Sequence, residues 1–427
     1  MEALQGGTAD HLLPCTASNT ETCQIVSELV TWNKLLRGSR FEIREDPETC
    51  NQLCVTNSTT APPMEEIFDT EQWPQYQKLL EWLLTTHRCI GSVSLRLSSM
   101  EDTSPSLLRA VCQNRWIKTL SIADIKTTAA AAVVDILPCL TSIEKLHLTP
   151  EEIPPDVFVA PVSTLLEASA CLSSLHVSGK FAQGGTIDML FTGLLRKPTL
   201  AELHFQDLSV HGDAYPQPVK EYLGSTTSLK VLSVTTRTPS MQMAVLEGVL
   251  ENGSIEKLSL DLFRGTEEIM PLVSRVIKTK RAIRILNISR SVPVPPAEPS
   301  VYDCLVLPLI ENDTLQEVGV PFYIFHSATG SALLRALPAK ENLKMVRITS
   351  TCRTPQLHWL CAELKRSGAE EKVSLEGYSL TMDIRFLHCK AFSMANLSFA
   401  EYERKLAALV RLPNCQHLKM IAIYTKN

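Results

Sequence analysis

The sequence predicts an α/β solenoid, in which short parallel strands form one long sheet and helices cover one of its faces. Three observations lead to this prediction. A short aliphatic pattern recurs along the chain with a mean period of about 28 residues. Within each copy, apolar and polar residues alternate as in a strand that is buried on one face. The stretches between copies have the spacing of helices, so each period holds one strand and one helix.

The repeated pattern consists of an aliphatic residue, two variable residues, a second aliphatic, one variable residue and a third aliphatic. The first aliphatic residues of its copies are Ile90, Ile117, Ile143, Leu172, Leu200, Leu229, Ile255, Ile283, Leu315 and Leu343. A weaker copy includes Val373 and Leu375, and Leu418 begins the last one. Because one residue separates the second and third aliphatics, both point to the same side of a strand. Each copy therefore predicts one short, half-buried strand that pairs with its neighbours.

Helical spacing fills the intervals between these strands. The clearest examples are Ser106–Cys112, Ala131–Leu137, Met243–Leu250 and Ile269–Ile277. A strand, a turn, a helix and a return within one period make successive strands parallel. Helices are wider than the strand spacing of about 4.8 Å, so stacked units bend with the helices outside. We therefore expect a horseshoe with a parallel concave sheet and convex helices.

These repeats resemble leucine-rich repeats of the ribonuclease-inhibitor type, which have a similar length and carry helices on the convex side. The resemblance extends over residues 85 to 427. The repeat parts of NLR-type receptors and of F-box leucine-rich-repeat proteins are similar in the same way. The family usually has Asn or Cys three residues after the third aliphatic, where the side chain bonds the turn backbone. This chain has other residues there, among them Ser98, Ile125 and Glu151, so its repeats are divergent.

Two regions follow from the extent of the repeats. Residues 86–427 are expected to form a leucine-rich-repeat array of about 11–12 units, and residues 1–85 a helical N-terminal capping region. Within the latter, Thr22–Leu36 and Thr70–Leu84 have the spacing of amphipathic helices. A cap shields the open edge of the first strand. The alternative is a degenerate adaptor module such as an F-box, although its Leu-Pro-led three-helix signature is not found.

Charge and composition exclude several classes of protein. The 41 Lys and Arg against 46 Asp and Glu give a formal net charge of −5, without the basic excess that binds nucleic acid or anionic lipid. The first residues lack the pattern of a signal peptide, and no apolar run reaches the roughly 18 residues of a membrane span. The 13 cysteines form no tight framework, which favours reduced thiols and a cytoplasmic location.

Catalytic and metal-binding motifs are not found in the sequence. It has no phosphate-binding loop, no G-x-S-x-G, no H-E-x-x-H and no paired C-x-x-C. The nearest metal-like groups are Cys50 with Cys54, and Cys352 with His358 and Cys361, and neither has a second pair at ligand spacing. We therefore expect a protein that is not an enzyme, with no cofactor, no metal site and no small-molecule substrate.

Aligning the copies brings one set of polar residues together. The residue between the second and third aliphatics points to the concave face, and in three consecutive copies it is His147, His176 and His204. Neighbouring strands place these side chains roughly 5 Å apart. The previous outward position of the same strands holds Lys145, Ser174 and Glu202. The histidines have three interpretations: a solvated polar ladder, a binding or pH-sensitive contact surface, and a metal site. A metal site fits least, because imidazoles in a straight line do not readily surround one ion.

The resulting functional prediction is an interaction scaffold that binds a protein partner on its concave face through these six residues. Binding there is expected to respond to pH between about 5 and 7.5. One alternative is a substrate-recruiting subunit of a ubiquitin ligase. Another is a GTPase-activating regulator, similar to the Ran GTPase-activating proteins, for which Arg237 and Arg264 are candidate arginines. A second candidate surface is the N-terminal region with Trp73, Tyr76 and Trp82.

Overall fold

The computed structural model divides into two compact units, an N-terminal unit (Met1–Gln206) and a C-terminal unit (Asp207–Asn427). The residues it describes are 15, 23–36, 39, 41–46, 49, 52–58, 73–97, 104–151, 153–179, 184–197, 199–208, 215–262, 266–289, 299–326, 329–349 and 354–375. The copy of the repeat predicted at Leu418 lies outside these residues. Each unit is described by itself below.

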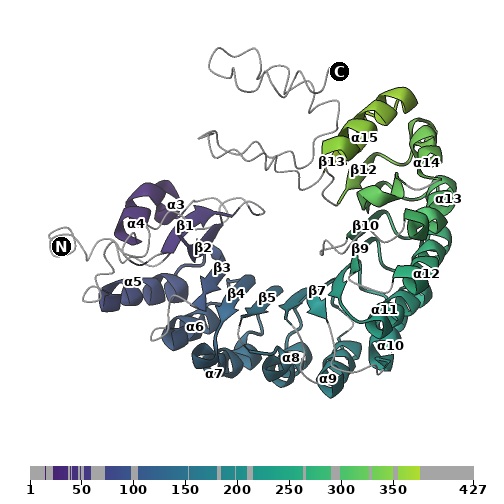
Figure 1. Ribbon diagram of the computed structural model, residues 1–427. Coiled ribbons are helices and arrows are strands. Elements are labelled where there is room, and N and C mark those ends of the chain that lie inside the picture. The colour runs from purple at the N-terminus through teal and green to yellow at the C-terminus, as the bar shows by residue number, and fades with distance from the viewer. Residues whose placement is uncertain are drawn as a thin grey trace, which may run out of the picture. The chain divides into compact units, whose positions relative to one another are not determined.

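Parallel strands form the sheet of the N-terminal unit (Figure 1). They are β3 (Ile90–Arg96), β4 (Thr119–Ile125), β5 (Lys145–Pro150), β6 (Ser174–Ser178) and β7 (Glu202–Leu208), of which β7 reaches the unit boundary. The second aliphatic of each repeat pairs with that of the next, as Leu146 does with Leu175 and Leu175 with Leu203. These three leucines are fully buried. The register therefore follows the repeat predicted from the sequence.

Helices pack side by side on one face of this sheet (Figure 1). They are α6 (Ser104–Gln113), α7 (Thr127–Ile136), α8 (Asp156–Ala168) and α9 (Gly184–Leu195), with a short 3₁₀ turn (Leu137–Cys139) after α7. Their buried side chains, such as Val133, Leu165 and Phe191, fill the space above the aliphatic residues of the strands. The core of the unit thus lies between the sheet and the helices, as in any two-layer α/β repeat.

The N-terminal region contains the two predicted helices and also a β-hairpin. The first predicted helix is broken into α3 (Gln24–Ser27) and α4 (Leu29–Leu36), and the second is α5 (Trp73–Thr86). Strands β1 (Phe41–Glu45) and β2 (Leu53–Asn57) pair antiparallel, and β2 continues the sheet by pairing parallel with β3. The hairpin, which has no counterpart in the helical region predicted from the sequence, covers the edge of β3 that would otherwise be open.

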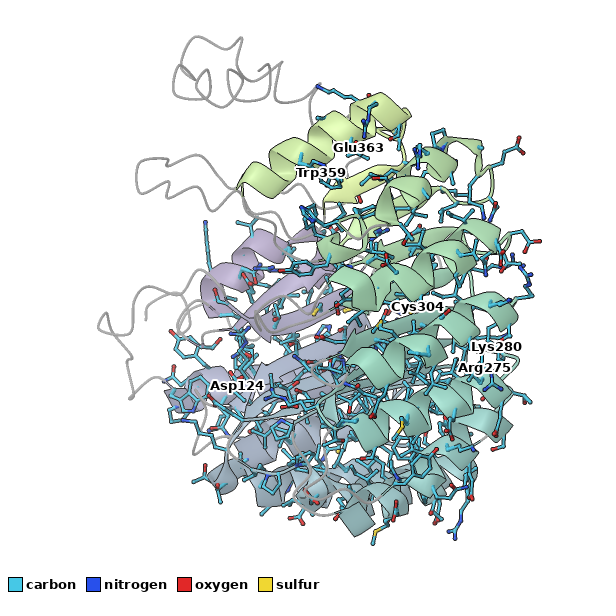
Figure 2. The ribbon with its side chains drawn as sticks, turned by 45° about the vertical axis from the view of Figure 1, so that its right-hand side comes forward. Asp124, Arg275, Lys280, Cys304, Trp359 and Glu363 are labelled. Atoms are coloured by element: carbon cyan, nitrogen blue, oxygen red, sulfur yellow. The ribbon has the colours of Figure 1, made fainter. Side chains whose placement is uncertain are left out.

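The C-terminal unit repeats the same alternation. Its strands are β8 (Val231–Thr236), β9 (Lys257–Leu262), β10 (Ile285–Ser289), β11 (Glu317–Val320), β12 (Met345–Ile348) and β13 (Val373–Leu375), each parallel to the next. Its helices are α10 (Gln217–Ser225), α11 (Pro239–Glu251), α12 (Thr266–Thr279), α13 (Asp303–Glu311), α14 (Gly330–Ala336) and α15 (Thr354–Ser367), with 3₁₀ turns at Pro299–Tyr302, Phe322–Ile324 and Leu337–Ala339. Trp359 of α15, labelled in Figure 2, packs against Phe322 with ring centroids 6.2 Å apart.

In most repeats a buried or half-buried polar residue closes the turn between a helix and the next strand. It lies three positions before the first aliphatic residue, and Asn252 shows its role most fully. Its Oδ1 accepts the backbone N–H groups of Ser254 and Ile255 at 2.7 and 2.9 Å. Its Nδ2 donates to the carbonyl oxygens of Leu223 and Thr226 at 2.7 and 2.8 Å. The amide thus ties its own turn to the preceding repeat.

The same position carries a bonding polar side chain in other repeats, namely Asn114, Ser169, Lys197, Lys280 and Asn312. Lys280, labelled in Figure 2, donates from Nζ to the carbonyl of Asn252 at 2.6 Å. The residue that bonds the turn therefore precedes the strand in this chain. The residue that usually bonds the turn in the family follows the third aliphatic residue by three positions. We call these turn-bonding residues, together with Asn252, the turn ladder.

Parallel strands in register, helices on one face and one strand per period establish a divergent leucine-rich-repeat fold.

Within the described part of the chain, every helix is too short or too polar to cross a membrane.

Candidate functional site: a polar groove on the N-terminal sheet

Three histidines lie in one row on the face of the N-terminal sheet that is opposite to the helices. His147 pairs in register with His176, and His176 with His204. Their ring centroids are 5.2 and 5.7 Å apart, and the planes of the second pair are nearly parallel at 17°. The flanking residues Leu146 and Leu148 are buried toward the helices, so the alternation of the strand turns the imidazole outward. We call His147, His176 and His204 the histidine row.

A groove of about 400 Å³ lies over this row. Its lining comes from β2 to β7 and from the residue after β1: Asp46, Cys54, Ser92, Thr119, Lys145, His147, Ser174, His176, Glu202 and His204. Lys145, Ser174 and Glu202 pair with one another in register, as predicted, and form a second row beside the histidine row. The structure thus brings all six predicted residues together in what we call the sheet groove.

The electrostatics of the sheet groove favour uncharged imidazole at its centre. Burial, together with the neighbouring rings of His147 and His204, lowers the pKa of His176 to about 4. At neutral pH this ring offers one hydrogen-bond donor and one acceptor. The second row adds one cationic and one anionic side chain, Lys145 and Glu202. The sheet groove therefore presents mixed charge and hydrogen-bonding capacity.

The low pKa of His176 predicts a loss of stability on acidification. In the unfolded chain its pKa is about 6.5, so between about pH 6.5 and pH 4 the unfolded state binds the additional proton. Stability contributed by the neutral ring is present above this window and is lost as the pH falls through it. After allowance for solvent screening, the loss is about 1 to 2 kcal/mol. Urea unfolding of the protein and of His176→Gln at pH 7.5 and pH 4.5 measures it, and equal pH dependence of the two would contradict the assignment.

The sequence predicts that binding at the histidine row responds to pH between about 5 and 7.5, where unperturbed imidazoles titrate. The pKa of His176 lies below that range. The central ring of the histidine row therefore stays neutral over most of this range.

The corresponding face of the C-terminal unit is built differently. Its row consists of Ser233, Ser259, Asn287, Gly319 and Arg347, which pair in register along β8 to β12. Asn287 donates to Ser259 Oγ at 3.2 Å, and Arg347 forms an ion pair with Glu317 at 2.6 Å. Polar side chains of this row thus bond to one another or to a neighbour, whereas the N-terminal row consists of rings in contact, of which His176 and His204 are stacked.

The other surfaces singled out in the sequence receive less support. Trp73, Tyr76 and Trp82 are each half-buried, and Trp82 stacks on Trp32 with centroids 6.1 Å apart. They therefore contribute to packing within the N-terminal region. Arg237 forms an ion pair with Asp207. Arg264, Cys50, Cys352 and the side chains of His358 and Cys361 lie outside the residues that the structure describes.

Sequence reasoning missed the part of the sheet groove that comes from the hairpin. Asp46 and Cys54 line it, and both belong to the region expected to be only helical. Ser92 and Thr119 occupy the same outward position as Lys145 in the two preceding repeats, because Ser92 pairs with Thr119 and Thr119 with Lys145. Extending the alignment of the second row to these repeats would have found them.

Solved structures resemble this chain, although its sequence has no close match among known families. No protein-family model matches the sequence, and no curated protein sequence matches it. A crystal structure of the leucine-rich repeat-containing protein LegL7 from Legionella pneumophila is 12% identical and covers 70% of this chain and 86% of its own, with a TM-score of 0.38. A TM-score this low supports no inference, so the fold assignment rests on the register and layers described above.

Proposed function

We propose that this chain is a non-enzymatic interaction scaffold that binds a protein segment in the sheet groove of its N-terminal unit. The observation that carries the proposal is the histidine row: three imidazoles from consecutive strands, stacked in register beside a hollow of the sheet. A rigid, parallel sheet holds these side chains at fixed spacing, so a ligand meets them without ordering a loop.

The chemistry of the sheet groove favours a peptide-like occupant. Lys145 and Glu202 stand two strands apart in the second row, a separation of roughly 10 Å at the usual strand spacing. An extended segment laid across the strands would place an acidic side chain near the first and a basic side chain near the second. The histidine row beside them provides flat rings and hydrogen bonds, and its central ring, His176, is neutral; such groups suit backbone amides and aromatic side chains.

The occupant can be identified by crosslinking from inside the sheet groove. A photoreactive residue introduced in place of Thr119 would face a segment bound in the sheet groove. The same residue in place of Met189, which is 53% exposed on α9, would report contacts on the helix-covered face instead. Proteins captured from Thr119 and not from Met189 are the candidates for direct measurement.

The triple variant His147→Ala, His176→Ala, His204→Ala tests the proposal with such a candidate. We expect binding to weaken by about 10- to 100-fold, because central stacked side chains carry most of an interface energy. Calorimetric titration measures the affinity. The matched control is Ser233→Ala with Ser259→Ala, at the same repeat position in the C-terminal unit.

Two results would overturn the proposal. One is unchanged affinity of the correctly folded triple variant. The other is equal weakening by the serine control. Of the two arginines considered for a GTPase-activating role, Arg237, which the structure describes, forms an ion pair with Asp207.

A further inference from the structure

Four potential metal ligands converge at the start of the N-terminal unit. They are Cys15, Cys23, His87 and Cys89, and one ligand atom from each lies within 4.8 Å of all the others. Cys23, His87 and Cys89 are at most 4% exposed, and Cys15 is half-buried. All three cysteines are free thiols. We call this set the cysteine–histidine cluster.

Distances within the cluster fit the edges of a metal-centred tetrahedron. A zinc ion held by sulfur at about 2.3 Å and by nitrogen at about 2.0–2.1 Å has S···N edges of about 3.6 Å. The Nδ1 atom of His87 lies 3.6 Å from Cys23 Sγ and 3.9 Å from Cys89 Sγ. The imidazole thus faces two sulfurs at the spacing that a common metal ion requires.

The ring of His87 has no other polar role in the described chain. Its Nε2 atom is buried and has no hydrogen-bond partner among the described residues. The ring packs edge-on against Trp82, with centroids 4.6 Å apart, and Trp82 in turn stacks on Trp32. A buried imidazole usually satisfies its nitrogens, so a ring whose only polar neighbours are thiols calls for an explanation. A metal bound at Nδ1 explains why that nitrogen faces two sulfurs, and it places the ring proton on Nε2.

The protein backbone fixes the half of the cluster that belongs to the repeats. His87 and Cys89 lie in the tight connection between α5 and β3. Leu53 of the hairpin donates its N–H to the carbonyl of Cys89 at 2.8 Å. Asn114, the first asparagine of the turn ladder, donates to the carbonyl of His87 at 3.1 Å. Neighbouring elements on both sides therefore hold these two ligands in place.

The other half of the cluster comes from a distant part of the sequence. Cys23 precedes α3, and its carbonyl accepts the N–H of Val26 at 2.9 Å in the first turn of that helix. His87 is 64 residues further along the chain. A bond between these segments would close a long loop and constrain the unfolded chain strongly.

We propose that Cys15, Cys23, His87 and Cys89 form a structural zinc site that fastens the start of the chain to the first repeat. Soft thiolates with one imidazole are the donor set that selects zinc, and four protein ligands leave no open position for catalysis. Binding converts three thiols to thiolates and releases their protons to solvent. The sequence alone does not reveal this site, because the pairs Cys15 with Cys23 and His87 with Cys89 lack the usual spacing of zinc ligands and only folding brings them together.

Metal content of the full chain tests the proposal. Protein purified under reducing conditions from zinc-supplemented medium should contain about one zinc per chain by mass spectrometry of the metal. Cys23→Ser and Cys89→Ser should each lower this content at least several-fold. The matched control is Cys112→Ser, a half-buried free thiol of α6 outside the cluster, which should retain the full amount.

Cobalt titration uses the wild-type protein, so its result does not depend on whether the cysteine variants fold. Co²⁺ added to metal-free wild-type protein should give the intense visible absorption of a tetrahedral thiolate site, and added zinc should abolish it. Removal of zinc by a strong chelator should lower the melting temperature, and zinc should restore it. Octahedral cobalt spectra, zinc content far below one per chain, or a Cys23–Cys89 disulfide found in place of metal would overturn the proposal.

Discussion

Replacing Asn252 by alanine is expected to destabilise the C-terminal unit by about 3 kcal/mol. The side chain is 3% exposed and uses both its oxygen and its nitrogen in hydrogen bonds to backbone groups. Without it, the N–H of Ile255 and the carbonyl of Leu223 lose their partner in a place that water reaches poorly. Urea unfolding followed by circular dichroism measures the loss as a lower midpoint.

Asn287→Ala is the matched control for this change. Asn287 lies on the open face of β10 and is half-buried, with one hydrogen bond of 3.2 Å to Ser259. Its removal should cost less than about 1 kcal/mol. If Asn252→Ala costs no more than Asn287→Ala, the turn ladder does not hold the repeats together as we describe.

Gly330→Ala is expected to cost about 2 to 3 kcal/mol through steric overlap. Gly330 begins α14 and is buried. A Cβ atom there would meet the carbonyl oxygen of Ile324, and it would lie 2.6 Å from the carbonyl carbon of Phe325. Both obstacles are backbone atoms of the preceding 3₁₀ turn, so no side-chain rotation relieves the clash. Hydrogen exchange of the segment from Phe322 to Ala336 should accelerate, and thermal unfolding should occur earlier.

The control for the glycine variant is Gly253→Ala. A Cβ atom at Gly253 would meet no heavy atom within 4 Å. Its stability should change by less than about 0.5 kcal/mol. Equal stability of the two alanine variants would show that the close approach at Gly330 is relieved at little cost.

The repeat itself was determined by the sequence. Two aliphatic residues of one strand are buried on the same face only if one residue separates them. A period of about 28 residues leaves room for one helix between successive strands. These constraints are local, so they can be read without knowing the fold. They sufficed to place Leu146, Leu175 and Leu203 in register, and with them the histidine row.

The turn ladder was visible in the sequence only in part. Asn252 and Asn312 stand three positions before the first aliphatic residue, but serine or lysine takes that position in other repeats. Different side chains reach the carbonyl oxygen at the same position of the preceding repeat, as Asn252 reaches Thr226 and Lys280 reaches Asn252, because the turn requires a donor and not one residue type. The position therefore has no single repeated amino acid that would mark it in the sequence.

Tertiary structure alone decided the N-terminal hairpin and the environment of the side chains. Phe41, Ile43, Leu53 and Val55 alternate with polar residues, but two five-residue strands are too short to outweigh the helical signals around them. The low pKa of His176 needs two neighbouring rings and burial, which only adjacent strands provide. Cys23 and His87, 64 residues apart, meet because α3 and the connection before β3 pack together. Sequence periodicity fixes which residues face one way; contacts between distant segments depend on how the elements pack, and no local pattern encodes that.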